Sequence, residues 1–238
     1  MPTKPQLSKR RILKTALAQI DRVGLSKFSI KNLAEQLGVY PAAITWHVGN
    51  KDELITLVSA LVFDEVKLPD NRGRSWEEWL RETAHEVRAK MHQHPNLVPL
   101  IGSRLGPIIP SLPFVERVMS VFLEAGYDDD HLIQAFNYYV GTILGWVTIE
   151  LSTPSSPRVD LKKSYEETLD DLDSNLYPAL SANRALVSNK LFMLRWESGV
   201  ENPMDPSFDF VVDMVINGLS RFSEGDLESV KPESDHAG

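Results

Sequence analysis

The chain has 238 residues, and 42% of them are hydrophobic, which is enough to bury a sizeable core in one or two domains. It contains no cysteine, which excludes disulfides and thiolate metal sites. Its formal net charge of −8 argues at first against a nucleic-acid partner.

The charges are distributed unevenly along the chain. Residues 1–51 contain nine Lys or Arg and two acids, a net charge of +7, whereas residues 52–238 contain 16 bases and 31 acids, a net charge of −15. A basic N-terminal module on an acidic body is typical of a DNA-binding domain whose body is repelled by phosphate. Charge alone leaves chance clustering open as an explanation.

The N-terminus (MPTKPQLSKRR) is polar and basic and lacks the apolar run of a secretory signal. The longest nearly uncharged apolar stretch, Tyr138 to Leu151, is too short for a helix that spans roughly 30 Å of hydrocarbon. We therefore expect a cytoplasmic protein with no membrane partner.

Four helices are expected at the start of the chain, where apolar residues recur at helical spacing. A glycine ends each of the first two helices. The second helix begins with a Ser cap, the third with a Pro in its first turn, and the fourth with an Asn–Glu capping box. These signals are Gly24, Ser29, Gly38, Pro41, Asn50 and Glu53, and the expected ranges are 10–23, 29–37, 40–48 and 51–66.

The rest of the chain is also expected to be helical. Ser75 and Glu78 form a second capping box, and Asp128 is placed to cap a long helix. The expected ranges are 75–94, 97–103, 114–124, 128–152, 165–173, 178–197 and 206–222, with a loop over 153–164. Because there is no alternating strand pattern, the fold is predicted to be all-α. We expect a helix-turn-helix domain (1–51), a larger helical domain for ligand binding and dimerisation (52–222) and a polar, disordered tail (223–238).

The stretch SIKNLAEQLGVYPAAITWHVGNKDEL has the order of parts of a helix-turn-helix. Gly38 allows the tight turn, and Leu37, Val39, Ile44 and Val48 are expected as buried anchors. The remaining positions of the second helix can approach base edges or reach phosphates: Tyr40, Pro41, Ala42, Ala43, Thr45, Trp46 and His47. Each of these residues alone could be an ordinary packing or capping residue, but their order within a basic module favours DNA binding.

Residues 9 to about 58 resemble the DNA-binding domain of TetR-type repressors, which are one-component bacterial regulators. The matching pattern is Ser29-Ile30-x-x-Leu33-Ala34-x-x-Leu37-Gly38-Val39, Ile44-x-Trp46-His47-Val48 and Asn50-Lys51-x-x-Leu54. The Trp-His-Val and Asn-Lys segments are most similar to the tetracycline-repressor branch, which implies a related C-terminal domain over most of the remaining chain.

The resemblance implies which residues contact operator DNA. The matching positions are Lys31, Pro41, Ala42, Ala43, Trp46, His47 and Lys51. Thr45 stands where the family usually has Tyr, so a phosphate contact is expected to be shortened or lost, and Tyr40 is expected to replace it in part. Lys31 and Lys51 flank the second helix and are expected to contact phosphates.

Two of the expected helices, 128–152 and 206–222, are suited to self-association. Their apolar faces are broader than a single core-facing stripe requires. In the TetR family the corresponding helices form a four-helix bundle across a two-fold axis, so a homodimer is expected. Gly141-x-x-x-Gly145 allows close approach. The candidate dimerisation residues are Phe136, Val140, Gly141, Leu144, Gly145, Val211, Val215 and Leu219. Ordinary core helices remain the alternative.

The family also implies a small-molecule pocket between the middle helices of the body. The candidate lining residues are Trp79, His85, Arg104, Asn137 and Tyr138. Leu100 stands where tetracycline repressors place a metal-binding His, and Ile149 aligns with a metal-linked acid. We therefore expect a different ligand with no metal and no other cofactor.

A rival hypothesis is a carboxylate–histidine metalloenzyme, because Glu82-x-x-His85 and Asp128-x-x-His131 imitate the pairs of di-iron helix bundles. No strong candidates exist for the two further Glu that such a site needs, so we expect no enzyme. The sequence favours a homodimeric, ligand-responsive repressor that binds a palindromic operator and is released by an inducer. A regulator with no small-molecule ligand is the other alternative.

Overall fold

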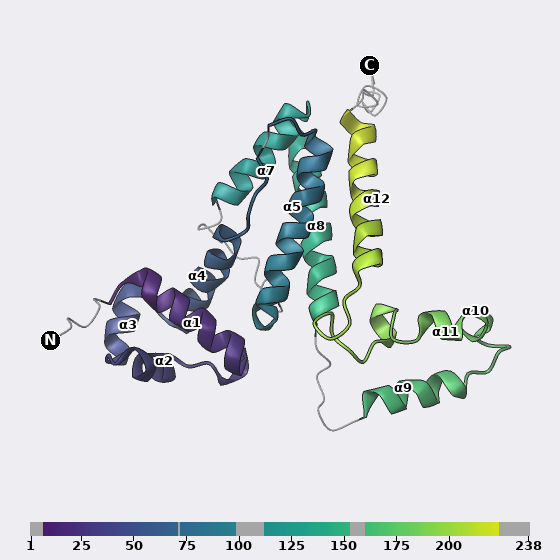
Figure 1. Ribbon diagram of the computed structural model, residues 1–238, viewed down its shortest axis with the longest axis horizontal. Helices are drawn as coiled ribbons and strands as arrows, with labels where there is room; N and C mark the ends of the chain where they lie inside the picture. The colour runs from purple at the N-terminus through teal and green to yellow at the C-terminus, as the bar shows by residue number, and fades with distance from the viewer. Residues whose placement is uncertain (1–6, 71, 99–111, 153–159, 224–238) are drawn as a thin grey trace, which may run out of the picture.

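A computed structural model describes residues 7–70, 72–98, 112–152 and 160–223, and every regular element in these ranges is helical, as predicted. Three parts are distinguishable in Figure 1. The head contains α1 (Lys9–Val23), α2 (Ile30–Leu37), α3 (Pro41–Val48) and α4 (Lys51–Asp64). The body contains α5 (Trp76–Gln93), α7 (Leu112–Glu124), α8 (Asp129–Leu151) and α12 (Asp205–Ser223). A lobe, residues 161–197, contains α9 (Leu161–Asp170), α10 (Pro178–Ala182) and α11 (Arg184–Val187).

The expected start and stop signals of the head are all in use. The Ser29 hydroxyl accepts a hydrogen bond from the Asn32 N–H, and Asn50 with Glu53 forms a complete capping box. Gly38 ends α2 in the left-handed conformation, with φ of 69°, which a residue with a Cβ adopts at a cost. This turn sets the angle at which α3 leaves α2.

In the body, α5, α8 and α12 pack against one another, and a row of acid–base pairs joins α5 to α12. The α5 members of this row are Arg81, His85 and Arg88, which pair with Asp213, Asp209 and Asp205 of α12. The two helices are antiparallel (Figure 1), so residues that follow one another by about one turn along α5 pair with residues that precede one another by about one turn along α12.

Glu150 is the buried centre of a junction between α5, α8 and the segment that returns from the lobe. Its carboxylate accepts two hydrogen bonds from Arg88, at 2.9 and 2.7 Å, and a third from the Met204 N–H at 3.0 Å. The Glu150 carbonyl accepts the Gly199 N–H at 2.7 Å, and a Cβ at Gly199 would lie 2.4 Å from the Glu150 side chain. The returning chain is therefore held directly against the end of α8.

Several element boundaries differ from the sequence-based expectation. Residues 161–164, expected in a loop, form the first turn of α9, because Asp160 caps that helix through the Lys163 N–H. The helical turns expected over 178–197 are α10, α11 and a 3-10 turn, Phe192–Leu194. Asp128 precedes α8, but its side chain makes no capping hydrogen bond. Residues 99–103 of the expected helix 97–103 and the expected tail after Ser223 lie outside the described residues. Among the described helices, none is long and apolar enough to cross a membrane.

Candidate nucleic-acid interface

The second helix of the motif, α3, is anchored on one side and bare on the other. Ile44 and Val48 are buried in the head core, at 0% and 5% exposure, while Leu37 and Val39 pack partly buried against it. Trp46 on α3 is 82% exposed, and Tyr40, the N-cap residue that precedes the helix, is 85% exposed. Two large aromatic side chains in water, one just before a short helix and one within it, indicate a contact surface, because such groups are normally buried.

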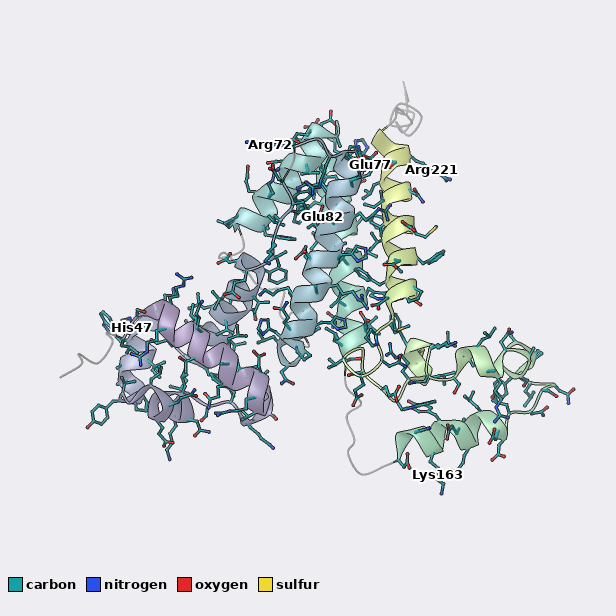
Figure 2. All side chains as sticks on the ribbon, viewed as in Figure 1. His47, Arg72, Glu77, Glu82, Lys163 and Arg221 are labelled. Atoms are coloured by element: carbon teal, nitrogen blue, oxygen red, sulfur yellow. The ribbon has the colours of Figure 1, made fainter. Side chains whose placement is uncertain are left out.

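The other predicted contact residues lie along α3. The rings of Trp46 and His47 meet edge to face with centroids 4.7 Å apart, and Figure 2 shows His47 at the edge of the head away from the body. Pro41 and Ala42 are exposed, and Ala43 is half-buried. The Thr45 hydroxyl donates to the Ala42 carbonyl at 3.2 Å, so it is turned back onto its own helix. The structure therefore brings all seven predicted α3 residues onto one end of the head.

The two predicted phosphate-contact lysines differ in their local partners. Lys31 lies exposed on the first turn of α2, and Lys51 lies exposed at the start of α4. The Lys51 ammonium donates to the Phe28 carbonyl at 2.8 Å and lies 5.7 Å from the centre of the Phe28 ring. Lys51 thus fixes the segment before α2 to α4, a role that the sequence did not suggest.

The face of α8 and α12 turned away from the core is partly apolar. Of the eight predicted dimerisation residues, Phe136, Val140, Leu144 and Val211 are half-buried, and both glycines are exposed with nothing within 4 Å of a built Cβ. Val215 and Leu219 were expected on this face but are buried in the chain's own core, because they share the inner side of α12 with Phe208 and Val212. Sequence reasoning missed the exposed apolar residues Phe210, Met214, Ile133 and Ile149. For α12, the breadth of the apolar pattern in the sequence was the signal that could have indicated its exposed apolar residues.

The structure does not bring the predicted ligand-lining residues together. Trp79 is buried and its indole N–H donates to the Pro69 carbonyl at 2.9 Å. His85 faces α12, with Nε2 3.6 Å from Asp209 Oδ1. Asn137 and Tyr138 are exposed, and the Tyr138 hydroxyl lies 3.9 Å from a Cβ built at Gly218 of α12. Arg104 lies outside the described residues.

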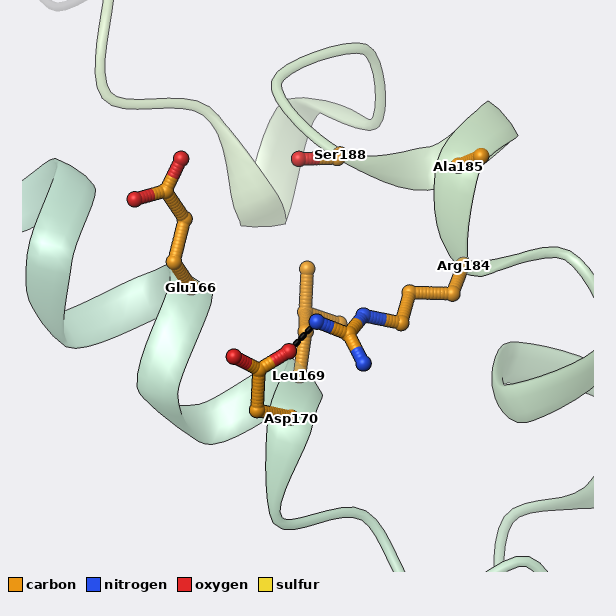
Figure 3. A pocket seen from close by; sticks show the side chains of 6 residues that line it. All are labelled: Glu166, Leu169, Asp170, Arg184, Ala185 and Ser188. Atoms are coloured by element: carbon orange, nitrogen blue, oxygen red, sulfur yellow. Dashed lines mark ion pairs between the residues drawn. The ribbon is translucent and has the colours of Figure 1, made fainter.

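A cavity of about 410 Å³ lies in the lobe between α9 and α11 (Figure 3). Its charged walls are neutralised in part by an ion pair between Asp170 and Arg184, drawn as a dashed line. The lining residues are Glu166, Leu169, Asp170, Arg184, Ala185 and Ser188. The lobe lies on the opposite side of the molecule from α3 (Figure 1).

Two stretches of the chain match known families. Residues 12–58 match "Bacterial regulatory proteins, tetR family", and residues 68–222 match "Tetracyclin repressor-like, C-terminal domain". The chain belongs to the TetR family. As a TetR-family protein it is a DNA-binding transcriptional regulator and not an enzyme.

Relatives of this TetR-family protein include an HTH-type transcriptional regulator of Saccharopolyspora erythraea, 28% identical over 76% of both chains. The tetracycline repressor protein class C of Escherichia coli is 22% identical over 95% of this chain and 97% of the relative. The crystal structure of apo ActR from Streptomyces coelicolor has the same fold, with a TM-score of 0.73 and 24% identity over 92% of this chain and 97% of ActR. ActR has also been crystallised with actinorhodin.

The geometry also weakens the metalloenzyme hypothesis for this TetR-family protein. Glu82 pairs with Arg74 at 3.0 Å, and His85 pairs with Asp209, so the two members of that motif have separate partners. His131 Nδ1 lies 4.0 Å from Asp128 at the opposite end of α8 from the Glu150 junction. No group of three or more His, Asp or Glu within the described ranges is arranged to hold a metal ion.

Proposed function

We propose that the protein is a cytoplasmic homodimeric repressor that binds a palindromic operator and is released by a small-molecule inducer. The observation that carries this proposal is the exposure of Trp46 on α3 and of Tyr40 at its N-cap, in a basic head where Ile44 and Val48 anchor the helix. Helix-turn-helix proteins place such a helix in the major groove and use dimers to read two half-sites about one helical turn apart.

The bare apolar face of α8 and α12 supports the homodimer. Phe210 and Met214 are one helical turn apart and are 64% and 54% exposed. Gly141 and Gly145 are likewise one turn apart on α8, which permits a second helix to approach closely. A second copy of the same face would cover these groups in a symmetric contact.

We propose that the inducer binds in the body. Ligand binding is supported by two proteins of similar fold, which have been crystallised with actinorhodin and, in the case of one from Acinetobacter baumannii, with minocycline. In this chain, the Thr83 hydroxyl of α5 is fully buried and has no hydrogen-bond partner among the described residues. A buried hydroxyl of this kind is available to a polar ligand group. Leu100 and Ile149 cannot ligate a metal, so we propose a ligand bound without one.

The test starts with selection of binding sites for the native dimer from random duplex DNA, followed by titration of the selected site. Trp46→Ala should weaken binding about 10- to 100-fold, the loss of roughly 1–3 kcal/mol of base or phosphate contact, with an unchanged melting temperature. Tyr177→Ala removes an exposed aromatic of the lobe and is the matched control. A wild-type protein that selects no DNA sequence would refute the operator proposal.

Native mass spectrometry of protein purified from its own host tests the inducer. A co-purified small molecule that lowers operator affinity when added back supports release by ligand. Equal affinity of the ligand-saturated and ligand-free protein would show that binding of the molecule does not regulate the head.

A further inference from the structure

Hydrogen bonds connect the C-terminal end of α1 to the C-terminal end of α5. They join the head to the body in addition to the covalent link through α4. Asp21 Oδ2 lies 2.9 Å from His94 Nδ1, and the Asn96 amide donates to the carbonyls of Ile20 and Asp21 at 3.2 and 3.0 Å. His94 ends α5, and Asn96 lies in the 3-10 turn that follows, η2 (Pro95–Leu97). Asp21, His94 and Asn96 are called the head–body junction below.

The Asp21–His94 pair of the junction is shielded from water on most sides, whereas Asn96 is exposed. The side chains of His94 and Asp21 are 13% and 29% exposed, and Leu97 and Val98 beside them are buried in the same core as α1. The last carbonyls of a helix have few partners within the helix. The Ile20 carbonyl accepts the Gly24 N–H at 2.8 Å, and the Asn96 amide adds a donor from the body to the carbonyls of both Ile20 and Asp21. Shielded, paired polar groups fix geometry better than a surface ion pair does.

Movement of this junction would be transmitted to α3. Helix α1 contacts α2, α3 and α4, so the four helices share one core and move as a unit. A second link, from Lys90 of α5 to Glu65 at 3.3 Å and from Glu65 to Lys14 at 4.0 Å, holds the middle of α1. The junction, by contrast, holds the end of α1 that lies closest to α5, while α3 lies on the far side of the head (Figure 1).

We propose that the head–body junction sets the spacing between the two α3 helices of the dimer. Asp21, His94 and Asn96 are then positioning residues for DNA binding, although α3 makes the contacts with the bases. A ligand that displaces the end of α5 breaks these hydrogen bonds and lets α1 turn, so the two heads no longer match the half-sites. This inference rests on the homodimeric DNA-binding function proposed above.

The experiment varies the distance between half-sites. Half-sites selected by the wild-type dimer are joined by spacers that change in steps of one base pair, and affinity is measured for each spacing. We expect the wild type to prefer one spacing. His94→Gln and Asn96→Ala should keep the half-site sequence while the preference for that spacing over its neighbours falls about tenfold.

Two controls isolate the hydrogen bond from the fold. His94→Asn places an amide near the position of Nδ1 and should retain the wild-type spacing preference. His131→Gln removes a histidine paired with Asp128 within the body, at 4.0 Å, and should bind as the wild type does. Melting temperatures report any loss of stability separately.

The outcomes separate this inference from the proposed function. Wild-type protein that selects no DNA overturns the proposed function and this inference with it. If the wild type selects half-sites but His94→Gln and Asn96→Ala keep its spacing preference, only the role of the junction is wrong. A loss of affinity that is equal at every spacing would likewise assign these residues to stability alone and overturn the inference.

Discussion

The head and the lobe are both small groups of short helices, yet they are held in different ways. The head surrounds a core of fully buried side chains contributed by each of its helices, including Ile12, Leu33, Ile44 and Leu54. In the lobe, of the apolar side chains that the structure describes, only Leu169 is buried, and Leu176, Leu186 and Met193 are exposed. The head is stabilised by its own core, whereas the lobe depends on its attachment to the body.

The lobe is attached to the body at the Glu150 junction. The chain returning from the lobe is bonded there through the N–H groups of Gly199 and Met204. Arg88 also meets Asp205 at 2.7 Å and lies against the Phe208 ring, so the start of α12 is fixed at the same point. A change at Glu150 should therefore affect the lobe and α12 while leaving the head intact.

Glu150→Ala should produce the largest loss of stability. Among the described residues it leaves the buried Arg88 with the exposed Asp205 as its one ion-pair partner, and breaking such a buried pair costs about 3–5 kcal/mol. Chemical denaturation measures the loss, and limited proteolysis should show faster cleavage within residues 161–197. Glu167→Ala, which removes a surface pair with Lys163, is the control and should cost less than about 0.5 kcal/mol. Equal losses of stability in both variants would contradict the view that the lobe depends on the Glu150 junction.

The Glu150 junction should also make the stability of the protein depend on pH. Burial by itself raises the pKa of Glu150, but hydrogen bonds from Arg88 and the Met204 N–H, with the His92 ring nitrogen 3.5 Å away, lower that pKa to about 2. Because the folded pKa lies below the ordinary value of 4.5, this stabilisation is present above about pH 4.5 and is lost as the pH falls towards 2. The melting temperature of the wild type should fall more steeply over this range than that of Glu150→Gln. Parallel curves would show that the carboxylate carries no such linkage.

Phe210→Glu should weaken the dimer, since it places a charge on the exposed apolar face of α12. We expect the dissociation constant of the dimer to rise at least about tenfold, measured by analytical ultracentrifugation. Leu123→Glu changes a residue of similar exposure on α7 and serves as the control. Dissociation by Leu123→Glu with an intact Phe210→Glu dimer would place the interface elsewhere.

The smallest effect is expected in the head. Lys31→Gln removes one exposed positive charge at the start of α2, so operator affinity should fall a few-fold at every DNA sequence. The slope of log affinity against log salt concentration should decrease by about one. Lys163→Gln, on the lobe, should leave the slope unchanged. An unchanged slope for Lys31→Gln would remove this lysine from the phosphate contacts.

The fold of the head could be predicted closely from the sequence, because its determinants are local. Caps at Ser29 and Asn50 and the stop at Gly38 act within a few residues, and the pattern of apolar residues over one or two turns identifies the buried side of α3. The exposed side of α3 follows by subtraction, and for this reason the predicted contact residues lie together.

The body could be predicted less well, because its faces are decided by pairs far apart in the chain. An apolar pattern on α12 identifies an amphipathic helix but does not say which apolar residues face α5. Val215 and Leu219 therefore lie in the core, while Phe210 and Met214 are exposed. His85 was expected in a pocket and instead faces Asp209, a residue 124 positions further along the chain.

The sequence by itself determined an all-helical chain with a basic helix-turn-helix at its start, since helix caps and apolar spacing act over a few residues. Only the tertiary structure decided how Glu150 unites α5, α8 and α12, and how Asp21 and His94 join the head to the body. These contacts form between groups separated by 50 or more positions, and no local pattern specifies which of many acids and bases will meet.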